Sequence, residues 1–363
     1  MAGNCSAPGA RCKVERMRRA ALIVVIAGIY VGCARQPVSV TPSPEPPRPQ
    51  RGGTVRLALS ITERSALALH GLAGRDDEEA AFASDRIGRW SRLASSTLLD
   101  HVEFVPDRRI EAVELFLLGE IDLAPVYGRS AGRLQGVDPA QVRLLRAPGW
   151  DRTYLIRLDA RTRWINDPNF RRWFAETVDR VDLVSGLFDG YGVPAWTVQS
   201  HTPGPVWNPP VRHPFNPASH PVLHLKYDPN DRAAHSIASR MKALFAAEGV
   251  DLRLTGGDDV DRPELTLVAH QRWSADPVVA LEPLVSAAGT AGEGARHYFE
   301  QAQSAFGAAR ENLATLAEDA LLIDALVVPL VRLEAWIAVS PALEGVQPGL
   351  TGELALEKVW WNR

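Results

Sequence analysis

Apolar residues along 51–363 recur with two spacings that alternate along the chain. Repeats of two predict strands, and repeats of three and four predict helices. Strand spacing occurs in residues 51–60, 98–106, 120–128, 151–160, 220–229, 250–254, 263–270 and 327–339. Helix spacing occurs in residues 110–119, 168–178, 231–249 and 311–325. Because strands alternate with helices, the pattern predicts α/β layers with mostly parallel sheets.

The predicted helices also have residues that are typical of helix ends. Asp167 precedes Pro168, and an aspartate N-cap with proline at the first helical position is a common helix start. The helix that follows has its large apolar residues on one face: Phe170, Trp173, Phe174 and Val178. Gly119 and Gly249 follow two other predicted helices, as expected for residues that end a helix in the left-handed conformation.

An uncharged apolar run with arginines before it lies at residues 20–31. A basic segment, a short apolar segment and a small residue before the cut are typical of a secretory signal. The run is shorter than the about 20 apolar residues that a membrane span needs. It ends at Gly32-Cys33, which resembles the lipobox of bacterial lipoproteins. The resemblance implies cleavage before Cys33 and lipidation of that cysteine.

An uncleaved signal anchor with an incidental cysteine is the alternative. Met17 is a better start than Met1, since residues 17–33 alone form a compact lipoprotein signal, and Cys5 and Cys12 would then not be translated. Residues 34–50 contain six prolines and almost no large apolar residue. This composition favours an extended tether that holds the folded part away from a membrane surface.

Composition excludes several classes of site and partner. All three cysteines lie at or before Cys33, so the folded part has neither a disulfide framework nor a cysteine zinc site. The net charge is −3, with 40 basic and 43 acidic residues interspersed, which argues against a nucleic-acid partner. We expect no cofactor and no bound metal.

Two further patterns leave other chemistries open. Residues 128–132, GRSAG, fit the G-x-S-x-G nucleophile elbow of hydrolases, with Ser130 as nucleophile and His297 as a candidate base. So short a match is weakly specific in a chain with 28 glycines, and we expect no enzyme. A loose group of histidines could suggest a metal site: His201, His213, His220 and His224. On one strand the last two would lie about 13 Å apart, too far to share an ion, so we expect solvated loop histidines.

Five segments, in order, resemble the family 5 extracellular solute-binding proteins, which are partners of ABC importers for oligopeptides, dipeptides and nickel. The most specific segment is residues 164–195, WINDPNFRRWFAETVDRVDLVSGLFDGYGVPA. Its residues at family positions are Asp167-Pro168, Arg171, Asp179-Arg180 and Gly190-Tyr191-Gly192. The other segments are residues 51–59, 98–126, 223–254 and 327–348.

The resemblance implies an α/β, two-lobed periplasmic-binding-protein-like (type II) fold that closes on a ligand at its hinge. The stretch between Ser60 and Leu98 is much shorter than in typical members, which implies a reduced N-terminal lobe and an altered pocket. We expect this order along the chain: 1–33 signal peptide and lipidated cysteine, 34–50 tether, 51–215 lobe I (completed by 338–363), and 216–337 lobe II.

The resemblance also points to a ligand-binding residue. In peptide-binding members an acidic residue in a Trp-x-Ala-Asp pattern holds the peptide's α-ammonium group, and Trp273, Ala275 and Asp276 match this pattern. Asp276 is therefore the implied ligand anchor, with Trp273 beside it. A charge-assisted hydrogen bond from the ammonium group to a desolvated carboxylate would make Asp276 a strong anchor. The alternative is that Asp276, which precedes Pro277, caps the next helix.

We therefore expect an extracytoplasmic solute-binding lipoprotein that captures a small peptide or similar solute for an ABC-importer permease. It would be a monomer in the cell envelope, anchored to the membrane through lipid on Cys33 and facing the periplasm or the exterior. The alternative is a degenerate or accessory lipoprotein that keeps the bilobal scaffold for protein–protein contact.

Overall fold

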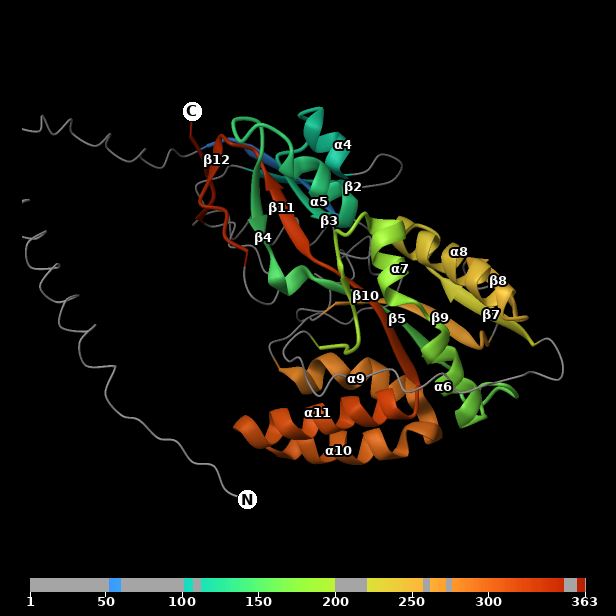
Figure 1. The fold of residues 1–363 in the computed structure, drawn as a ribbon. Helices are drawn as coiled ribbons and strands as arrows, with labels where there is room; N and C mark the ends of the chain where they lie inside the picture. The colour runs from blue at the N-terminus through green and yellow to red at the C-terminus, as the bar shows by residue number, and fades with distance from the viewer. Residues whose placement is uncertain are drawn as a thin grey trace, which may run out of the picture. The chain divides into compact units, whose positions relative to one another are not determined.

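The computed structural model describes residues 52–59, 101–106, 112–199, 221–256, 262–271, 276–348 and 358–362. The chain divides into two units, Met1–Arg48 and Pro49–Arg363, and every described residue belongs to the second. Cys33 and Trp273 lie outside the described residues. Within the second unit, strands and helices alternate along the chain and gather into two larger sheets (Figure 1).

Sheet A has the strand order β2-β1-β3-β11-β4. Its strands are β1 (Thr54–Leu59), β2 (His101–Pro106), β3 (Leu123–Tyr127), β4 (Arg143–Arg146) and β11 (Ala335–Val339). β1 is parallel to β2 and β3, whereas β11 is antiparallel to β3 and β4. Two helices, α4 (Ala112–Leu117) and α5 (Gly128–Gln135), cover one face, where Val113 and Leu134 are buried with Val126.

The other face of sheet A packs against the C-terminal part of the chain. Val55 and Ile337 lie there in one apolar cluster with Leu343 and Val346, and with Trp150 from the short helix η1 (Pro148–Trp150). The short strands β12 (Leu343–Glu344) and β13 (Trp360–Trp361) pair antiparallel beside this cluster.

Sheet B has the strand order β6-β10-β5-β9-β7-β8. Its strands are β5 (Arg152–Leu158), β6 (Val193–Pro194), β7 (Val222–Tyr227), β8 (Asp251–Gly256), β9 (Leu265–Gln271) and β10 (Val327–Leu333). β5 is antiparallel to β9 and β10, and β7 is parallel to β8 and β9. The expectation of mostly parallel sheets is wrong for sheet B. The chain passes from sheet A into sheet B along β5 and leaves sheet B for sheet A along β10, so these neighbouring strands run in opposite directions.

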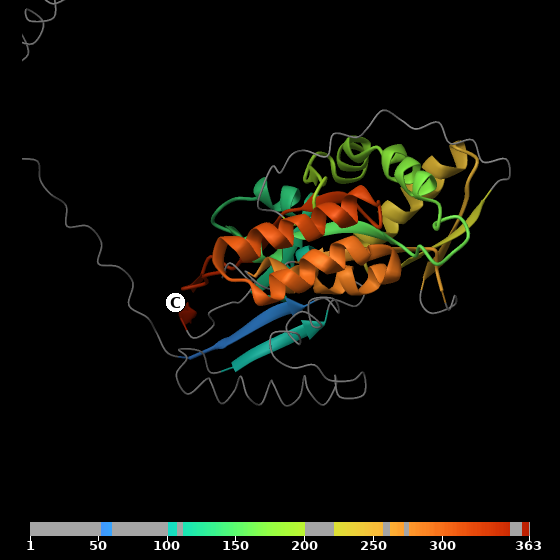
Figure 2. The same ribbon diagram turned by 90° about the horizontal axis from the view of Figure 1, so that it is seen from below.

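Helices cover both faces of sheet B. They are α6 (Pro168–Thr177), α7 (Arg180–Asp182), η2 (Leu183–Leu187), α8 (Arg232–Ala247), α9 (Pro277–Ala288), η3 (Gly289–Gly292), α10 (Glu293–Ser304) and α11 (Gly307–Ile323). Tyr154 and Ile156 face α6 and α8, where the Phe174 and Phe245 rings stack with centroids 4.3 Å apart. Leu155 faces the layer of α9, α10 and α11, in which α10 and α11 lie side by side (Figure 2).

The predicted strands and helix ends are confirmed at several points. The Asp167 carboxylate caps α6 by accepting a hydrogen bond from the N–H of Asn169 at 2.9 Å. Gly119 and Gly249 have positive φ after α4 and α8. The spacing analysis did not predict α5, α10 or β4. No helix in the described part of the chain is long and apolar enough to cross a membrane.

We call sheet A with α4 and α5 the first lobe, and sheet B with its helices the second lobe. The chain passes from sheet A to sheet B before the predicted lobe boundary at residue 215, since β5 and β6 are already strands of sheet B. Two described crossings join the lobes: residues 147–151 between β4 and β5, and Glu334 between β10 and β11.

Candidate functional site

The edges at which the two sheets face the crossings define the candidate site. In sheet A, Tyr127 at the carboxyl end of β3 pairs with Ala335, the first residue of β11 after the crossing. In sheet B, Gln271 at the carboxyl end of β9 pairs with Arg152, the first residue of β5. The parallel strands of both sheets therefore end at the crossings. In α/β sheets, ligands bind in the crevice outside the carboxyl ends of such strands.

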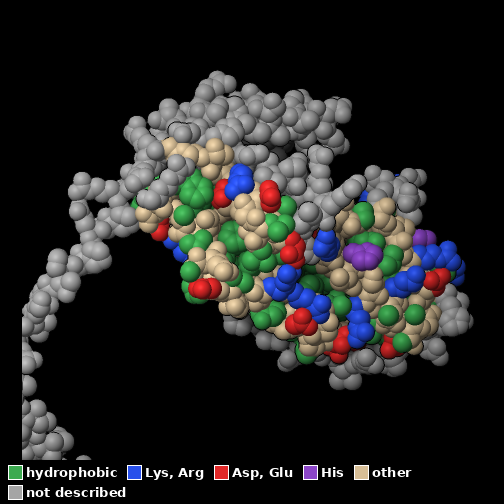
Figure 3. All heavy atoms as spheres, turned by 90° about the horizontal axis from the view of Figure 1, so that it is seen from above, with side chains coloured by type: hydrophobic (Ala, Val, Ile, Leu, Met, Phe, Trp, Pro, Cys, Tyr) green, Lys and Arg blue, Asp and Glu red, His purple; other side chains and the backbone are tan. Residues whose placement is uncertain are grey.

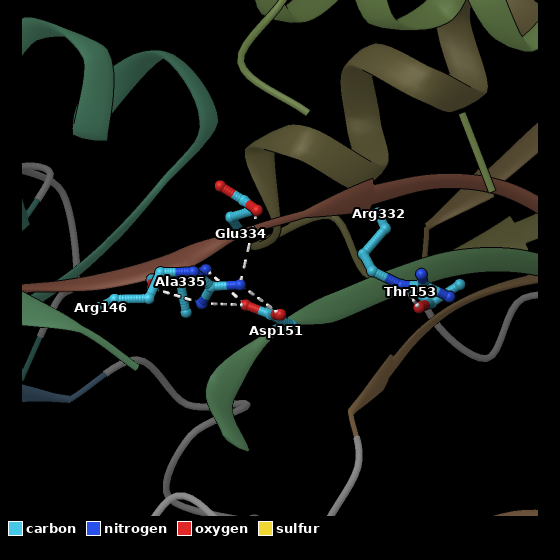
Figure 4. Close-up of polar contacts among 6 residues, drawn as sticks. All are labelled: Arg146, Asp151, Thr153, Arg332, Glu334 and Ala335. Atoms are coloured by element: carbon cyan, nitrogen blue, oxygen red, sulfur yellow. Dashed lines mark hydrogen bonds and ion pairs between the residues drawn. The ribbon is translucent and has the colours of Figure 1, made fainter. Parts of the chain in front are cut away.

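A polar network joins the two crossings (Figure 4). The Arg146 guanidinium donates to both oxygens of Asp151 at 2.6 Å, and it also donates to the carbonyl of Ala335 at 2.9 Å. Asp151 in turn accepts the Ala335 N–H at 2.8 Å, and Glu334 lies 3.6 Å from Arg146. Burial alone would lower the pKa of Arg146, but the hydrogen bonds and charge of Asp151 outweigh burial and raise it. The network fixes the start of β11 to the end of β4.

A second polar group lies on the α8 side of sheet B. The Arg152 guanidinium lies 4.1 Å from the centroid of the Tyr127 ring, so this contact joins the second lobe to the first. Tyr154 donates its O–H to Asp231, the N-cap of α8, at 2.9 Å. Burial, followed by the charge of Asp231, raises the pKa of Tyr154 well above its usual value. Tyr154 is therefore a neutral donor at physiological pH.

A third group lies on the opposite face of sheet B and holds residues 195–199, which we call the strap. Arg332 donates to the Thr153 hydroxyl and to the Thr197 carbonyl, both at 3.1 Å (Figure 4 shows the first pair). Glu318 of α11 accepts the N–H of Val198 at 2.6 Å. Burial raises the pKa of Glu318 to about 7 despite this hydrogen bond.

His270 is a buried titratable group on β9, opposite Thr153. Burial, with a smaller effect from the charge of Arg332, lowers its pKa to about 4. His270 is therefore neutral at physiological pH. Sequence reasoning missed Arg152, His270, Glu318 and Arg332. For Arg152, His270 and Arg332 the available signal was a charged or polar residue inside or at the end of an otherwise apolar strand. For Glu318 it was a charged residue next to apolar residues of a helix.

Asp276 is the predicted site residue that the structure describes, and it precedes α9. Its carboxylate accepts the Val278 N–H at 3.0 Å, which is the capping role that the sequence left open as an alternative. Arg310 of α11 also donates to it, from Nε at 3.0 and 3.1 Å and from Nη2 at 2.7 Å. A carboxylate has about four acceptor positions. These hydrogen bonds come from the protein itself and occupy most of that capacity.

The residues of the alternative chemistries are not brought together. Ser130 lies in α5 of the first lobe, whereas His297 lies in α10 of the second lobe and pairs with Gln301 at 2.9 Å. His224 contacts Glu264 at 3.1 Å, and the other three histidines of the loose group lie outside the described residues. Among the described residues, no group of three or more His, Cys, Asp or Glu could hold a metal ion.

Acidic and basic side chains lie next to one another on the face seen in Figure 3, which views the protein from the side of α4 and α5. Arg133 of α5 pairs with Glu114 of α4 at 2.5 Å. Arg240 of α8 pairs with Asp182 at 2.6 Å. The arginines at these positions are neutralised by acidic neighbours, in line with the interspersed charges of the sequence.

This fold is also found in solved bacterial binding proteins. The murein tripeptide binding protein MppA of Escherichia coli has a TM-score of 0.59 at 17% identity, over 75% of this chain and 60% of that chain. DppA, an ABC transporter-associated periplasmic binding protein from Helicobacter pylori in complex with the peptide STSA, gives 0.57 at 14%, over 74% and 58%. NikZ from Campylobacter jejuni, in complex with Ni(L-His), gives 0.55 at 14%, over 71% and 61%.

These neighbours are family 5 solute-binding proteins, so the resemblance seen in the sequence and the two-lobed α/β fold are confirmed. At such identities the similarity shows the fold alone. The chain spans 58% to 61% of the length of these three structures, consistent with a reduced lobe. No protein-family model matches the sequence, and no curated protein matches it by sequence comparison.

Proposed function

We propose that the protein is an extracytoplasmic solute-binding protein that captures a small peptide or similar solute and presents it to an ABC-importer permease. It acts as a monomer without enzymatic activity. Lipid on Cys33 attaches it to the membrane of the cell envelope, on the side of the periplasm or the exterior, and residues 34–50 separate the anchor from the lobes.

One observation supports the proposal more than any other. Both sheets end their parallel strands at the same edge, and among the described residues the chain crosses that edge at 147–151 and at Glu334. Two lobes joined by two short crossings can rotate about them, and rotation lets ligand contacts form from both sides at once. The structural neighbours whose names include peptides or Ni(L-His) have the same fold.

We propose Asp276 and Trp273 as the residues that receive the ammonium end of a peptide. Because Arg310 already pairs with the Asp276 carboxylate, the ligand's ammonium group must displace this guanidinium. The Arg310 side chain is 23% exposed, so it has access to solvent once displaced. Ligand binding at Asp276 is then an exchange of one cation for another, which lowers the net gain in affinity.

A thermal-shift screen of the full chain with Cys33→Ser tests this function. The ligands are dipeptides, tripeptides, amino acids and nickel with histidine. A ligand that binds only the folded state at 100 times its Kd adds about 2.7 kcal/mol to the free energy of unfolding, so the melting temperature should rise measurably. Small-angle scattering with the same ligand should show a smaller radius of gyration as the lobes close.

The occupied carboxylate of Asp276 favours a second candidate, the accessory lipoprotein that keeps the scaffold for protein–protein contact. In that case Arg310 is the permanent partner of Asp276, and the crevice needs no solute. The second candidate predicts that no ligand in the screen changes the melting temperature or the radius of gyration. It also predicts that Arg310→Gln, which releases the carboxylate, does not create binding of free peptides.

A further inference from the structure

Helix α5 of the first lobe packs on a loop of the second lobe, residues 188–192, beside the crossing at Glu334. Gly132 lies on the contacting side of the helix, where an added Cβ would overlap the Tyr191 ring and come within 2.6 Å of its Cε1. At Gly128, which has φ +49°, an added Cβ would lie 3.4 Å from Phe188. The two glycines of GRSAG therefore let a helix of one lobe approach an aromatic loop of the other.

An ion pair lies beside this contact. Arg129 donates from Nε to Asp189 at 2.7 Å and from Nη2 at 3.0 Å. The two side chains are 53% and 60% exposed, so the pair contributes little to stability. It instead orients the loop relative to α5. Asp189 has φ +52°, a conformation that non-glycine residues adopt rarely. A backbone held in this conformation points the carboxylate at the other lobe.

The loop is fixed firmly to the second lobe. Tyr191 donates its N–H to the Phe188 carbonyl at 2.8 Å, which closes the turn. Gly192 has no space for a side chain, since an added Cβ would lie 3.0 Å from Leu333 and 3.1 Å from the Arg332 carbonyl. Leu333 is the last residue of β10 before the crossing at Glu334. Movement of the crossing therefore acts directly on the loop that contacts α5.

We propose that this contact is an interlobe latch, formed by Gly128, Arg129 and Gly132 of α5 with Phe188, Asp189 and Tyr191 of the loop. The latch holds the lobes together beside the crossing at Glu334, so that the lobes rotate about this side of the molecule and the crevice opens on the side away from it. This inference goes beyond solute capture, because it concerns the movement of the lobes without any ligand. It also gives GRSAG a role in packing.

The latch is tested by measuring the distance between the lobes in the absence of any ligand. The full chain with Cys5, Cys12 and Cys33 changed to serine has no other thiol. Spin labels on Leu118→Cys of the first lobe and Lys242→Cys of the second, both exposed positions, then report the distance by pulsed electron paramagnetic resonance. Gly132→Ala displaces Tyr191, so the mean distance should become longer or its distribution wider.

Gly136→Ala is the matched control at the end of the same helix. Gly136 has φ −88°, and the nearest atom to an added Cβ is 3.7 Å away, so the distance distribution should stay that of the wild type. Tyr191→Ala removes the ring without adding atoms and should widen the distribution. Adding Gly132→Ala to Tyr191→Ala should change nothing further, because the overlap is gone.

A wild-type distribution for both Gly132→Ala and Tyr191→Ala would overturn the latch. If Gly132→Ala does not fold, Tyr191→Ala alone decides, since it creates no overlap. An additive effect of the two substitutions would also contradict the proposed contact. None of these results depends on whether a solute binds, so failure of the latch is separate from failure of the proposed function.

Discussion

Two buried arginines, Arg171 and Arg180, bind backbone carbonyls of segments far apart in the chain. Arg171 donates to the carbonyls of Ile165 at 2.9 Å and Asp324 at 2.7 Å. Arg180 donates to four carbonyls, those of Ala175, Val178, Ala195 and Pro329, and lies 4.4 Å from the Trp196 ring centroid. Both arginines belong to the most specific matching segment in the sequence. Their contacts show that this part of the match concerns the fold rather than a ligand.

Arg180→Met should reduce the free energy of unfolding by at least about 3 kcal/mol. It leaves four buried carbonyls without their donor, and each unsatisfied buried group costs roughly 1–3 kcal/mol. Burial lowers the pKa of Arg180 to about 10, so the native side chain is still charged at neutral pH. Urea unfolding measures the change. Arg253→Met, on an exposed side chain of β8, is the control and should stay within about 0.5 kcal/mol of the wild type.

Glu318 should make stability depend on pH between about pH 4.5 and 7. Its pKa is raised from 4.5 to about 7 in the folded protein, chiefly by burial. Folding therefore favours the protonated form. The stabilisation is complete below pH 4.5 and is lost as the pH rises through 7, by about 3 kcal/mol for a shift of this size.

Glu318→Gln should remove this part of the pH dependence, because the amide does not titrate and can still accept the Val198 N–H. Chemical unfolding at pH 5 and pH 8 measures it in both proteins. Glu311→Gln, an exposed position on the same helix, should keep the wild-type dependence. Equal slopes for the wild type and Glu318→Gln would show that Glu318 does not titrate in this range.

At the scale of elements, spacing predicted the helices and strands whose apolar residues lie on one face of a sheet. α6 and α8 are of this kind, since Phe174 and Phe245 are fully buried against sheet B. β4, RLLR, has no fully buried residue, and α5 begins with GRSAGR, so neither has a clear apolar period. These elements depend on contacts made by the other lobe or by distant strands. Sequence spacing does not contain that information.

Asp276 is the N-cap of α9, and the proposed ligand contact is tested at this helix end. Asp276→Asn keeps a capping side chain but removes the charge. If the carboxylate receives a peptide ammonium group, binding should weaken by roughly 2–5 kcal/mol. That corresponds to about thirtyfold or more in Kd, since 1.4 kcal/mol is tenfold. Calorimetric titration with a peptide found in the screen measures it, and an N-acetylated form of that peptide should bind both proteins equally weakly.

Asp167→Asn is the matched control, because Asp167 caps α6 ahead of a proline in the same way. It should leave peptide affinity unchanged. Arg310→Gln should strengthen binding of the free peptide, since the ligand no longer has to displace a guanidinium. Wild-type affinity in both Asp276→Asn and Arg310→Gln would rule out Asp276 as the anchor and favour the accessory lipoprotein.

At the scale of the whole molecule, the resemblance predicted two lobes, but the contacts that join them could not be predicted from the sequence. Asp151 accepts a hydrogen bond from Ala335, 184 residues later in the chain. Gly132 of GRSAG packs on Tyr191 of the matching segment DGYG. Each motif was visible in the sequence, yet neither indicates its partner. Spacing reports local periods, whereas these contacts depend on how β4, β5, β10 and β11 cross between the sheets.

The proposed lipid anchor determines where the whole protein acts. Lipid on Cys33 would bring the lobes to a membrane that no described helix can span. One lipid-modified cysteine after a secretory signal predicts that metabolically labelled fatty acid appears in the wild type and that the protein sediments with membranes. Cys33→Ser should abolish both results, whereas Cys12→Ser should keep both. Fatty acid on Cys33→Ser at the wild-type level would refute lipid attachment at Cys33. Sedimentation of both proteins with membranes, without fatty acid on either, would instead support the uncleaved signal anchor.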